Sequence, residues 1–215
     1  DLNNLFKNLL EKFYIKSDLK IRSLIKILLE ALCTIDNNFA KNIAEDFCSS
    51  KIMEIKMIGL TSCIKYNHSN SINLLKKFYS EFQNDKIVLE KWFQIRSSYN
   101  NSYFDGINSI KDILKNKNFE YKNPNFVRAI FSSFQVNNIE LFHAKDDSGY
   151  KFVTDQIIII DKINPQTAAR IITPMTNISK FNYNTKNKIK RYLKKIINSN
   201  PSNDVFEVVS KALSQ

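Results

Sequence analysis

The chain has 215 residues, of which 43% are hydrophobic and 12% aromatic, a composition that excludes an intrinsically disordered protein. Only three glycines and four prolines interrupt it, which disfavours an all-β fold because such folds need many tight turns. The net charge of +11 fits either a codon bias toward Lys, Asn and Ile or an acidic partner, and no apolar run approaches the roughly 20 residues of a membrane span.

Apolar residues recur with helical spacing along the first half of the chain. We expect the second helix to be capped by Ser17 or Asp18, and the third to begin after Asp36 and Asn37. Seven helices are predicted from apolar stripes within residues 2–13, 21–32, 39–47, 51–65, 72–82, 88–93 and 107–114.

Three Asn-Pro pairs, beginning at Asn123, Asn164 and Asn200, punctuate the second half. Asn caps free amides and Pro loses no hydrogen bond at the first helical position, so each pair predicts a helix start. The intervals of 41 and 36 residues each accommodate two helices and a turn, the unit size of HEAT-like repeats.

The isoleucine run at residues 157–160 could form a strand, but its flanks keep helical spacing and predict a helix. Pro174 is expected to kink or end the helix that begins at Pro165. The sequence therefore predicts an all-α chain of about a dozen antiparallel helices, arranged as one HEAT/armadillo-like α-α superhelix over residues 1–215. Because the chain opens on Asp1 without a signal-peptide pattern, we expect it to be a piece of a longer protein.

No catalytic or metal motif is found among these residues. A zinc peptidase motif needs His-Glu-x-x-His, and the sequences that follow His68 and His143 do not fit it. No glycine pattern of a phosphate-binding loop exists either. Cys33, Cys48 and Cys63 lie in apolar helical surroundings without Cys-x-x-Cys spacing, which predicts reduced, unreactive thiols and a cytosolic protein.

The best nucleic-acid candidate is the basic stretch of residues 180–195, which contains no acidic residue and several aromatic ones. The other interpretation is a solvated helix face whose apolar stripe points inward. We favour that interpretation, since the other basic residues are scattered and build no second patch. The stripe consists of Ile189, Tyr192, Leu193 and Ile196.

Four segments resemble a known family in their order, their spacing and their residues. They are "KWFQIRSS" at 91–98, "NPNFVRAIFSSF" at 123–134, "ELFHAKDDSGYKFV" at 140–153 and "NPQTAARIITPM" at 164–175. They are similar to the carboxy-terminal helical domain of bacterial aminopeptidase N, a zinc metallopeptidase. The resemblance is specific over residues 86–215 and looser before them.

The resemblance implies a helical domain that walls and gates the cavity through which peptides reach a zinc ion held by an upstream catalytic domain of the same chain. It implies no catalytic or metal residue here, because the family's zinc ligands, general base and amine-recognition motif belong to that earlier domain. It further implies that Arg128 and Arg170 face the cavity and bind substrate. Both follow an Asn-Pro helix start by a few residues, so they could project from one side. Their ordinary alternative is an ion pair or an exposed arginine.

The resemblance shares the stretch "HAKDDSGY" at 143–150 without placing catalysis there, so we interpret it as a junction before a helix. Asp147 or Ser148 is expected to cap that helix, Gly149 to lie in its first turn, and His143 to hydrogen-bond within the junction. The alternative function for the whole chain is a free-standing helical-repeat module that binds nucleic acid or an acidic protein.

Overall fold

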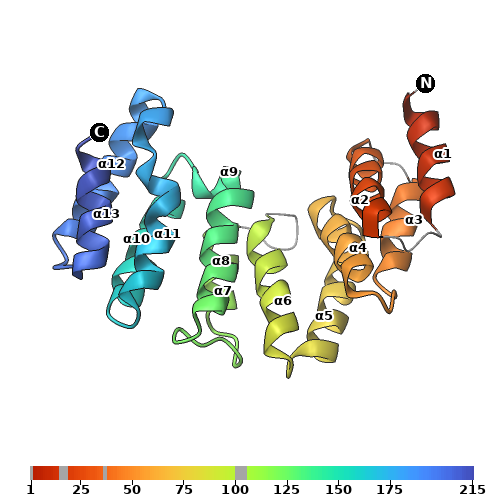
Figure 1. Ribbon diagram of the computed structural model, residues 1–215, viewed down its shortest axis with the longest axis horizontal. Coiled ribbons are helices and arrows are strands. Elements are labelled where there is room, and N and C mark those ends of the chain that lie inside the picture. The colour runs from red at the N-terminus through yellow and green to blue at the C-terminus, as the bar shows by residue number, and fades with distance from the viewer. Residues whose placement is uncertain (1, 15–18, 36–37, 100–105) are drawn as a thin grey trace. The chain divides into compact units, whose positions relative to one another are not determined.

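The computed structural model describes residues 2–14, 19–35, 38–99 and 106–215, and within these ranges it contains helices and turns but no strand. The all-helical prediction is therefore confirmed. The described residues divide into two compact units, one extending to Glu81 and the other beginning at Phe82 (Figure 1). That residues 1–215 form a single domain stays a prediction.

The first unit contains five helices, and each matches an apolar stripe of the sequence. The caps predicted at Ser17 or Asp18, and the helix start at Asp36 and Asn37, lie outside the described residues. The helices are α1 (Leu2–Tyr14), α2 (Leu19–Thr34), α3 (Asn38–Phe47), α4 (Met53–Lys65) and α5 (Ser71–Phe82), the last of which ends just beyond the boundary.

Aliphatic side chains of α1 and α2 and the close approach of α3 to α4 build the core of this unit. Leu10, Ile25 and Leu29 are fully buried there. At Gly59 of α4, a Cβ atom would lie 2.5 Å from the carbonyl oxygen of Ala44. It would also lie 2.9 Å from the backbone nitrogen of Cys48. Glycine at this position lets the two helices pack backbone against backbone.

The second unit is a two-layer array of helices. One layer runs from α6 through α8 and α11 to α13, and α7, α10 and α12 follow one another in the other layer. This layering is typical of armadillo-type repeats. The helices are α6 (Lys86–Ser98), α7 (Gly106–Ile113), α8 (Pro124–Asn137), α9 (Ile139–Phe142), α10 (Ser148–Asp161), α11 (Pro165–Thr176), α12 (Tyr183–Ile197) and α13 (Asn203–Leu213).

The Asn-Pro pairs begin helices at two of the three predicted places. The Asn123 side chain accepts a hydrogen bond from the Asn125 amide at 3.0 Å, and Asn164 accepts one from Thr167 at 2.9 Å. The third prediction is wrong in detail, because Asn200 has a left-handed backbone with φ of 53° and lies in the preceding turn. Ser202 caps α13 instead.

Two further expectations concern α10 and α11. The isoleucine run at residues 157–160 is helical, as predicted, and Ile157 and Ile160 are fully buried. The helix that begins at Pro165 passes Pro174 and ends two residues later at Thr176. Since Pro174 has no N–H, it cannot donate to the carbonyl four residues before it, which is that of Arg170.

A buried carboxylate joins the end of α10 to the start of α13. Asp161, the last residue of α10, accepts a hydrogen bond from the Ser202 backbone amide at 2.8 Å and another from the Ser202 hydroxyl. Asp161 is only 9% exposed, so the bonds to Ser202 satisfy a charge with little contact to water. The end of the α12–α13 segment that leads into α13 is consequently held against α10.

Candidate functional site

Arg128 lies in the second turn of α8, half-buried, and its guanidinium turns back over the start of its own helix. Its Nε donates to the carbonyl oxygen of Pro124 at 3.2 Å, and one terminal nitrogen donates to the Asn125 side chain. These bonds fix the planar group in one orientation. Among the described residues, the other terminal nitrogen has no recorded hydrogen-bond partner and is available to a ligand.

A shallow groove of about 220 Å³ opens between α6 and α8 beside Arg128. Glu90 and Gln94 come from α6, and Ala129 and Ser133 come from α8. The groove therefore offers a cation, an anion and amide and hydroxyl groups within a small area. Such a set can bind both the carbonyl oxygen and the amide N–H of a peptide group by charge-assisted hydrogen bonds.

Arg170 lies in the second turn of α11 and is exposed. Within the described part of the chain, no hydrogen bond or ion pair is recorded for its side chain. Of the two ordinary alternatives, the described residues show an exposed arginine at Arg170 and no ion pair. Its side chain extends into solvent from a helix whose buried side is formed by other residues. Those buried residues are Thr167, Ala168, Ile171, Ile172 and Met175.

The structure places the two arginines on neighbouring helices of one layer. The Gln135 side-chain amide of α8 donates to the carbonyl oxygen of Ile171 in α11 at 3.0 Å, deep in the contact between these helices. Arg170 directly precedes this contact, whereas Arg128 lies about two helical turns before it. The two arginines therefore lie on neighbouring helices, and they do not share one groove, since Arg128 lines the groove with α6 and Arg170 does not.

Residues 183–195 of the basic stretch lie in α12 (Tyr183–Ile197), and three of its basic side chains are paired with acidic residues. Lys188 and Arg191 both pair with Asp147, and Lys195 pairs with Asp155 at 2.6 Å. The predicted inward stripe is confirmed: Ile189, Leu193 and Ile196 are buried, and Tyr192 is half-buried. These ion pairs lower the positive charge that a nucleic acid would meet on this helix.

The predicted junction "HAKDDSGY" is confirmed in position, with a different role for Asp147. Helix α10 begins at Ser148, and Asp147 occupies the capping position without accepting a capping hydrogen bond. The Asp147 carboxylate points instead to Lys188, at 2.7 Å, and to Arg191. Asp146 accepts the Ser148 amide at 3.0 Å, so the neighbouring aspartate satisfies the free backbone donor.

His143 hydrogen-bonds within this junction, as expected. Its Nδ1 contacts the Tyr150 hydroxyl, and its ring packs against Phe142, Tyr150 and Phe181. Burial raises the pKa of Tyr150 to about 12 and lowers the pKa of His143. The phenol therefore keeps its proton and donates to a neutral imidazole, an arrangement that braces α9 against α10.

Acidification is expected to destabilise the second unit through His143. Its pKa is lowered in the folded chain, so the unfolded chain takes up the proton first, and the free energy of unfolding falls as the pH drops below about 6.5. Urea unfolding at several pH values between 8 and 5 would measure the slope, with His143→Phe as comparison. An equal slope in both proteins would contradict this assignment.

Sequence reasoning missed a cluster of thiols in the first unit. The Cys63 thiol hydrogen-bonds to Cys48, and Cys33 lies close enough to influence Cys63 electrostatically. A spacing of 15 residues in the chain gives no hint of this proximity, because α3 and α4 must first fold back on each other. Among the described residues, no group of three or more His, Cys, Asp or Glu side chains could hold a metal ion.

No helix in the described ranges is both long and apolar enough to span a bilayer.

The fold itself has a close counterpart among solved structures. A crystal structure of Legionella pneumophila aminopeptidase A in complex with aspartic acid superposes with a TM-score of 0.86 at 27% identity. The match covers 97% of this chain and 26% of that chain.

Curated relatives agree with this similarity. The chain is 34% identical over 141 residues to aminopeptidase N of Haemophilus influenzae and 26% identical over 142 residues to that of Escherichia coli, or 65% and 66% of this chain. It spans about a sixth of the length of these relatives, since 16% of each is covered. Residues 2–214 match the family described as "Domain of unknown function (DUF3458_C) ARM repeats". The chain therefore belongs to this family of armadillo-repeat domains.

Proposed function

We propose that this chain is the C-terminal domain of a zinc-dependent aminopeptidase, where it walls and gates the cavity that leads to the active site. The observation that supports this most strongly is the match of nearly the whole chain to about a quarter of aminopeptidase A. This match supports the proposal, because a repeat domain that makes up about a quarter of a larger peptidase is large enough to form a cavity wall.

The domain performs no catalysis alone in this proposal. No residue of the present chain is assigned to hold zinc; an upstream catalytic domain of the same chain would hold it, and the bound ion would supply an activated water and a Lewis acid for the scissile carbonyl. The residues of the present chain bind and orient peptide instead.

A cytoplasmic location is part of the same proposal and is supported by three free thiols, which persist in a reducing compartment.

Arg128 and Arg170 are the residues that we assign to peptide binding. Arg128 has a guanidinium fixed by its own helix and a groove beside it, so it is preorganised for the carboxylate or carbonyl of a peptide. Arg170 is exposed without a recorded partner among the described residues, and extends from the neighbouring helix. Together they could hold the part of a peptide that extends away from the metal.

Replacing Arg128 with alanine in the full-length enzyme is expected to lower kcat/KM for peptides about 10- to 100-fold, because a charge-assisted hydrogen bond contributes about 1.5–3 kcal/mol. Hydrolysis of an amino-acid anilide, which has no peptide carboxylate, should change little, and the zinc content should stay the same. Steady-state kinetics on peptides of increasing length, with metal analysis, would measure both effects.

Two variants make this experiment specific. Arg128→Lys keeps the charge but loses the planar fork, so it should recover only part of the peptide activity. Lys151→Ala removes an exposed cation from α10, in the other layer, and should leave the kinetics unchanged. Equal kinetics of Arg128→Ala and the parent enzyme on peptides of every length would refute the assignment. Loss of activity on peptide and anilide alike would point to a purely structural role.

A further inference from the structure

The cysteines of the first unit form a directional chain of hydrogen bonds that the proposed peptidase function does not use. Cys48, just beyond the end of α3, donates its thiol hydrogen to the carbonyl oxygen of Ala44 at 3.3 Å. Because that hydrogen is already engaged, the Cys48 sulfur can accept the hydrogen of Cys63 from α4. The two thiols therefore lie close to each other, one from the end of α3 and the other from α4.

The backbone geometry at this place keeps the two thiols together. Gly59 allows α4 to approach the backbone of Ala44 and Cys48, and Cys63 lies one helical turn beyond Gly59. Close packing of the two backbone segments favours the main geometric condition for a disulfide, namely a short separation between the two attachment points.

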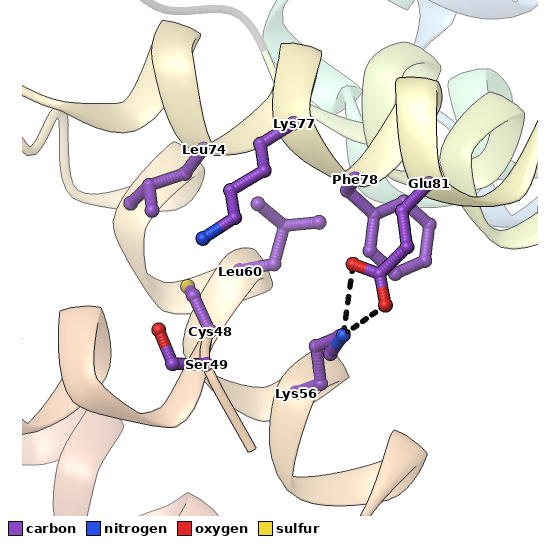
Figure 2. Close-up of a pocket in the computed structure, with 8 residues that line it drawn as sticks. All are labelled: Cys48, Ser49, Lys56, Leu60, Leu74, Lys77, Phe78 and Glu81. Atoms are coloured by element: carbon purple, nitrogen blue, oxygen red, sulfur yellow. Dashed lines mark hydrogen bonds and ion pairs between the residues drawn. The ribbon is translucent and has the colours of Figure 1, made fainter. Parts of the chain in front are cut away.

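The two thiols differ in their access to solvent. Cys48 is half-buried and lines a small cavity of about 20 Å³, together with Ser49 and Lys77 (Figure 2). Figure 2 shows the ammonium end of Lys77 and the Cys48 sulfur pointing toward each other across this cavity. A cavity of this size admits a molecule of about the size of water. Cys63 is 1% exposed and does not line this cavity.

We propose that Cys48 and Cys63 form a peroxide-sensitive thiol pair, in which hydrogen peroxide oxidises Cys48 and Cys63 then closes a disulfide bond between the end of α3 and α4. Accessible cysteines beside a resolving cysteine are the usual arrangement in redox-responsive proteins. The small cavity selects a small oxidant over a bulky disulfide such as oxidised glutathione.

The two steps balance as follows. The Cys48 sulfur attacks one peroxide oxygen, the O–O bond breaks, and the other oxygen leaves as water with the proton of the thiol, so that Cys48 becomes a sulfenic acid. The Cys63 sulfur then attacks the Cys48 sulfur and displaces the hydroxyl group, which leaves as a second water with the Cys63 proton. One peroxide is reduced to two waters, and two thiols are oxidised to one disulfide. The Lys77 ammonium lies where it can hydrogen-bond the departing oxygen.

The surroundings of the other thiols fix the order of these steps. The hydrogen bond to Cys48, and then burial, raise the pKa of Cys63, which keeps it protonated until its neighbour is activated. Burial raises the pKa of Cys33 to about 11, and Cys33 is only 4% exposed. Cys33 is therefore an internal control, because it belongs to the same core but does not border the cavity.

Peptide mapping of the folded full-length protein tests this proposal, because each thiol lies on a separate tryptic peptide. Cys33 falls in residues 27–41, Cys48 in 42–51 and Cys63 in 57–65. After brief exposure to hydrogen peroxide and alkylation of the remaining thiols, we expect a cross-link between 42–51 and 57–65, reversed by dithiothreitol. The peptide 27–41 should be alkylated fully, and oxidised glutathione should give at least about tenfold less cross-link.

Two variants separate the steps. Cys63→Ser should stop the reaction at the sulfenic acid on Cys48, which dimedone would trap, and Cys33→Ala should form the cross-link at the parental rate. The proposal is overturned if the parent protein keeps peptides 42–51 and 57–65 fully alkylated after peroxide, or if Cys33 oxidises first. It is also overturned if oxidised glutathione reacts faster than peroxide.

Discussion

Replacing Gly149 with alanine is expected to destabilise the second unit by about 3 kcal/mol or more, at the upper end of the range for overpacking a close contact. A Cβ at Gly149 would lie 2.5 Å from the carbonyl oxygen of Leu141 and 2.6 Å from Cα of Phe142, and would also contact the carbonyl oxygen of Phe142. All three are backbone atoms of α9 and its end, so no side-chain rotation relieves the clash. Urea unfolding followed by circular dichroism would measure the loss.

Gly106→Ala provides the matched control for this experiment. Gly106 has a left-handed φ of 64°, but a Cβ there would find no atom of the described residues within 4 Å. The control should therefore cost only about 1 kcal/mol, the ordinary penalty of a side chain in that conformation. If Gly149→Ala cost no more than Gly106→Ala, the close packing of α9 against α10 would be refuted.

Replacing Asp147 with asparagine is the second change for which we expect a large effect, a loss of about 2 kcal/mol. Asp147 is 8% exposed and pairs with Lys188 and Arg191, both from α12. Breaking a fully buried ion pair lowers the free energy of unfolding by about 3–5 kcal/mol. We expect a smaller loss here because both cations reach solvent, which screens the interaction. Asparagine tolerates the left-handed backbone of this position, with φ of 62°, so the measured loss reports the charge.

The control for the charge is Asp155→Asn. Asp155 of α10 pairs at 2.6 Å with Lys195, which lies in α12 as Lys188 and Arg191 do. Both side chains of this pair are more than 40% exposed. Its loss should change the free energy of unfolding by less than about 1 kcal/mol. Equal effects of the two substitutions in urea denaturation at pH 7 would show that Asp147 contributes no more than a surface ion pair.

The helices could be predicted from the sequence because their buried faces repeat with a local period. Ile189, Leu193 and Ile196 mark the inward face of α12 without any knowledge of its partner. Capping could also be predicted where it is local, as at Asn123 and Asn164. The four residues of α9 form little more than one turn, too short to show a helical period, and no helix was predicted there.

Contacts between distant segments could not be predicted in the same way. Asp147 has the sequence signature of a cap, but cations more than 40 residues away along the chain determine where its side chain points. The position of Gly149 in the first turn was correct, whereas its contact with the backbone of α9 depends on how α9 and α10 pack. The proximity of Cys48 and Cys63 likewise follows from the close approach of α3 to α4 at Gly59.

For the candidate site too, some features could be predicted from the sequence and others only from the folded structure. The positions of Arg128 and Arg170 after two Asn-Pro helix starts follow from the sequence, and the role in peptide binding stays a prediction. The fixation of Arg128 by Pro124 and Asn125, and the groove with Glu90 of α6, are visible only in three dimensions. No local signal marks a groove whose two walls are separated in the chain.

The link between Asp161 and Ser202 limits how the loop before α13 can vary. The Asp161 carboxylate accepts hydrogen bonds from both the amide and the hydroxyl of Ser202. The first turn of α13 is therefore anchored independently of the length of the loop that precedes it. Extra residues inserted between Asn198 and Ser202 would bulge into solvent and leave the register of the last helix unchanged. This loop is therefore the place in the second unit where an affinity tag or a reporter could be grafted with little cost to the fold.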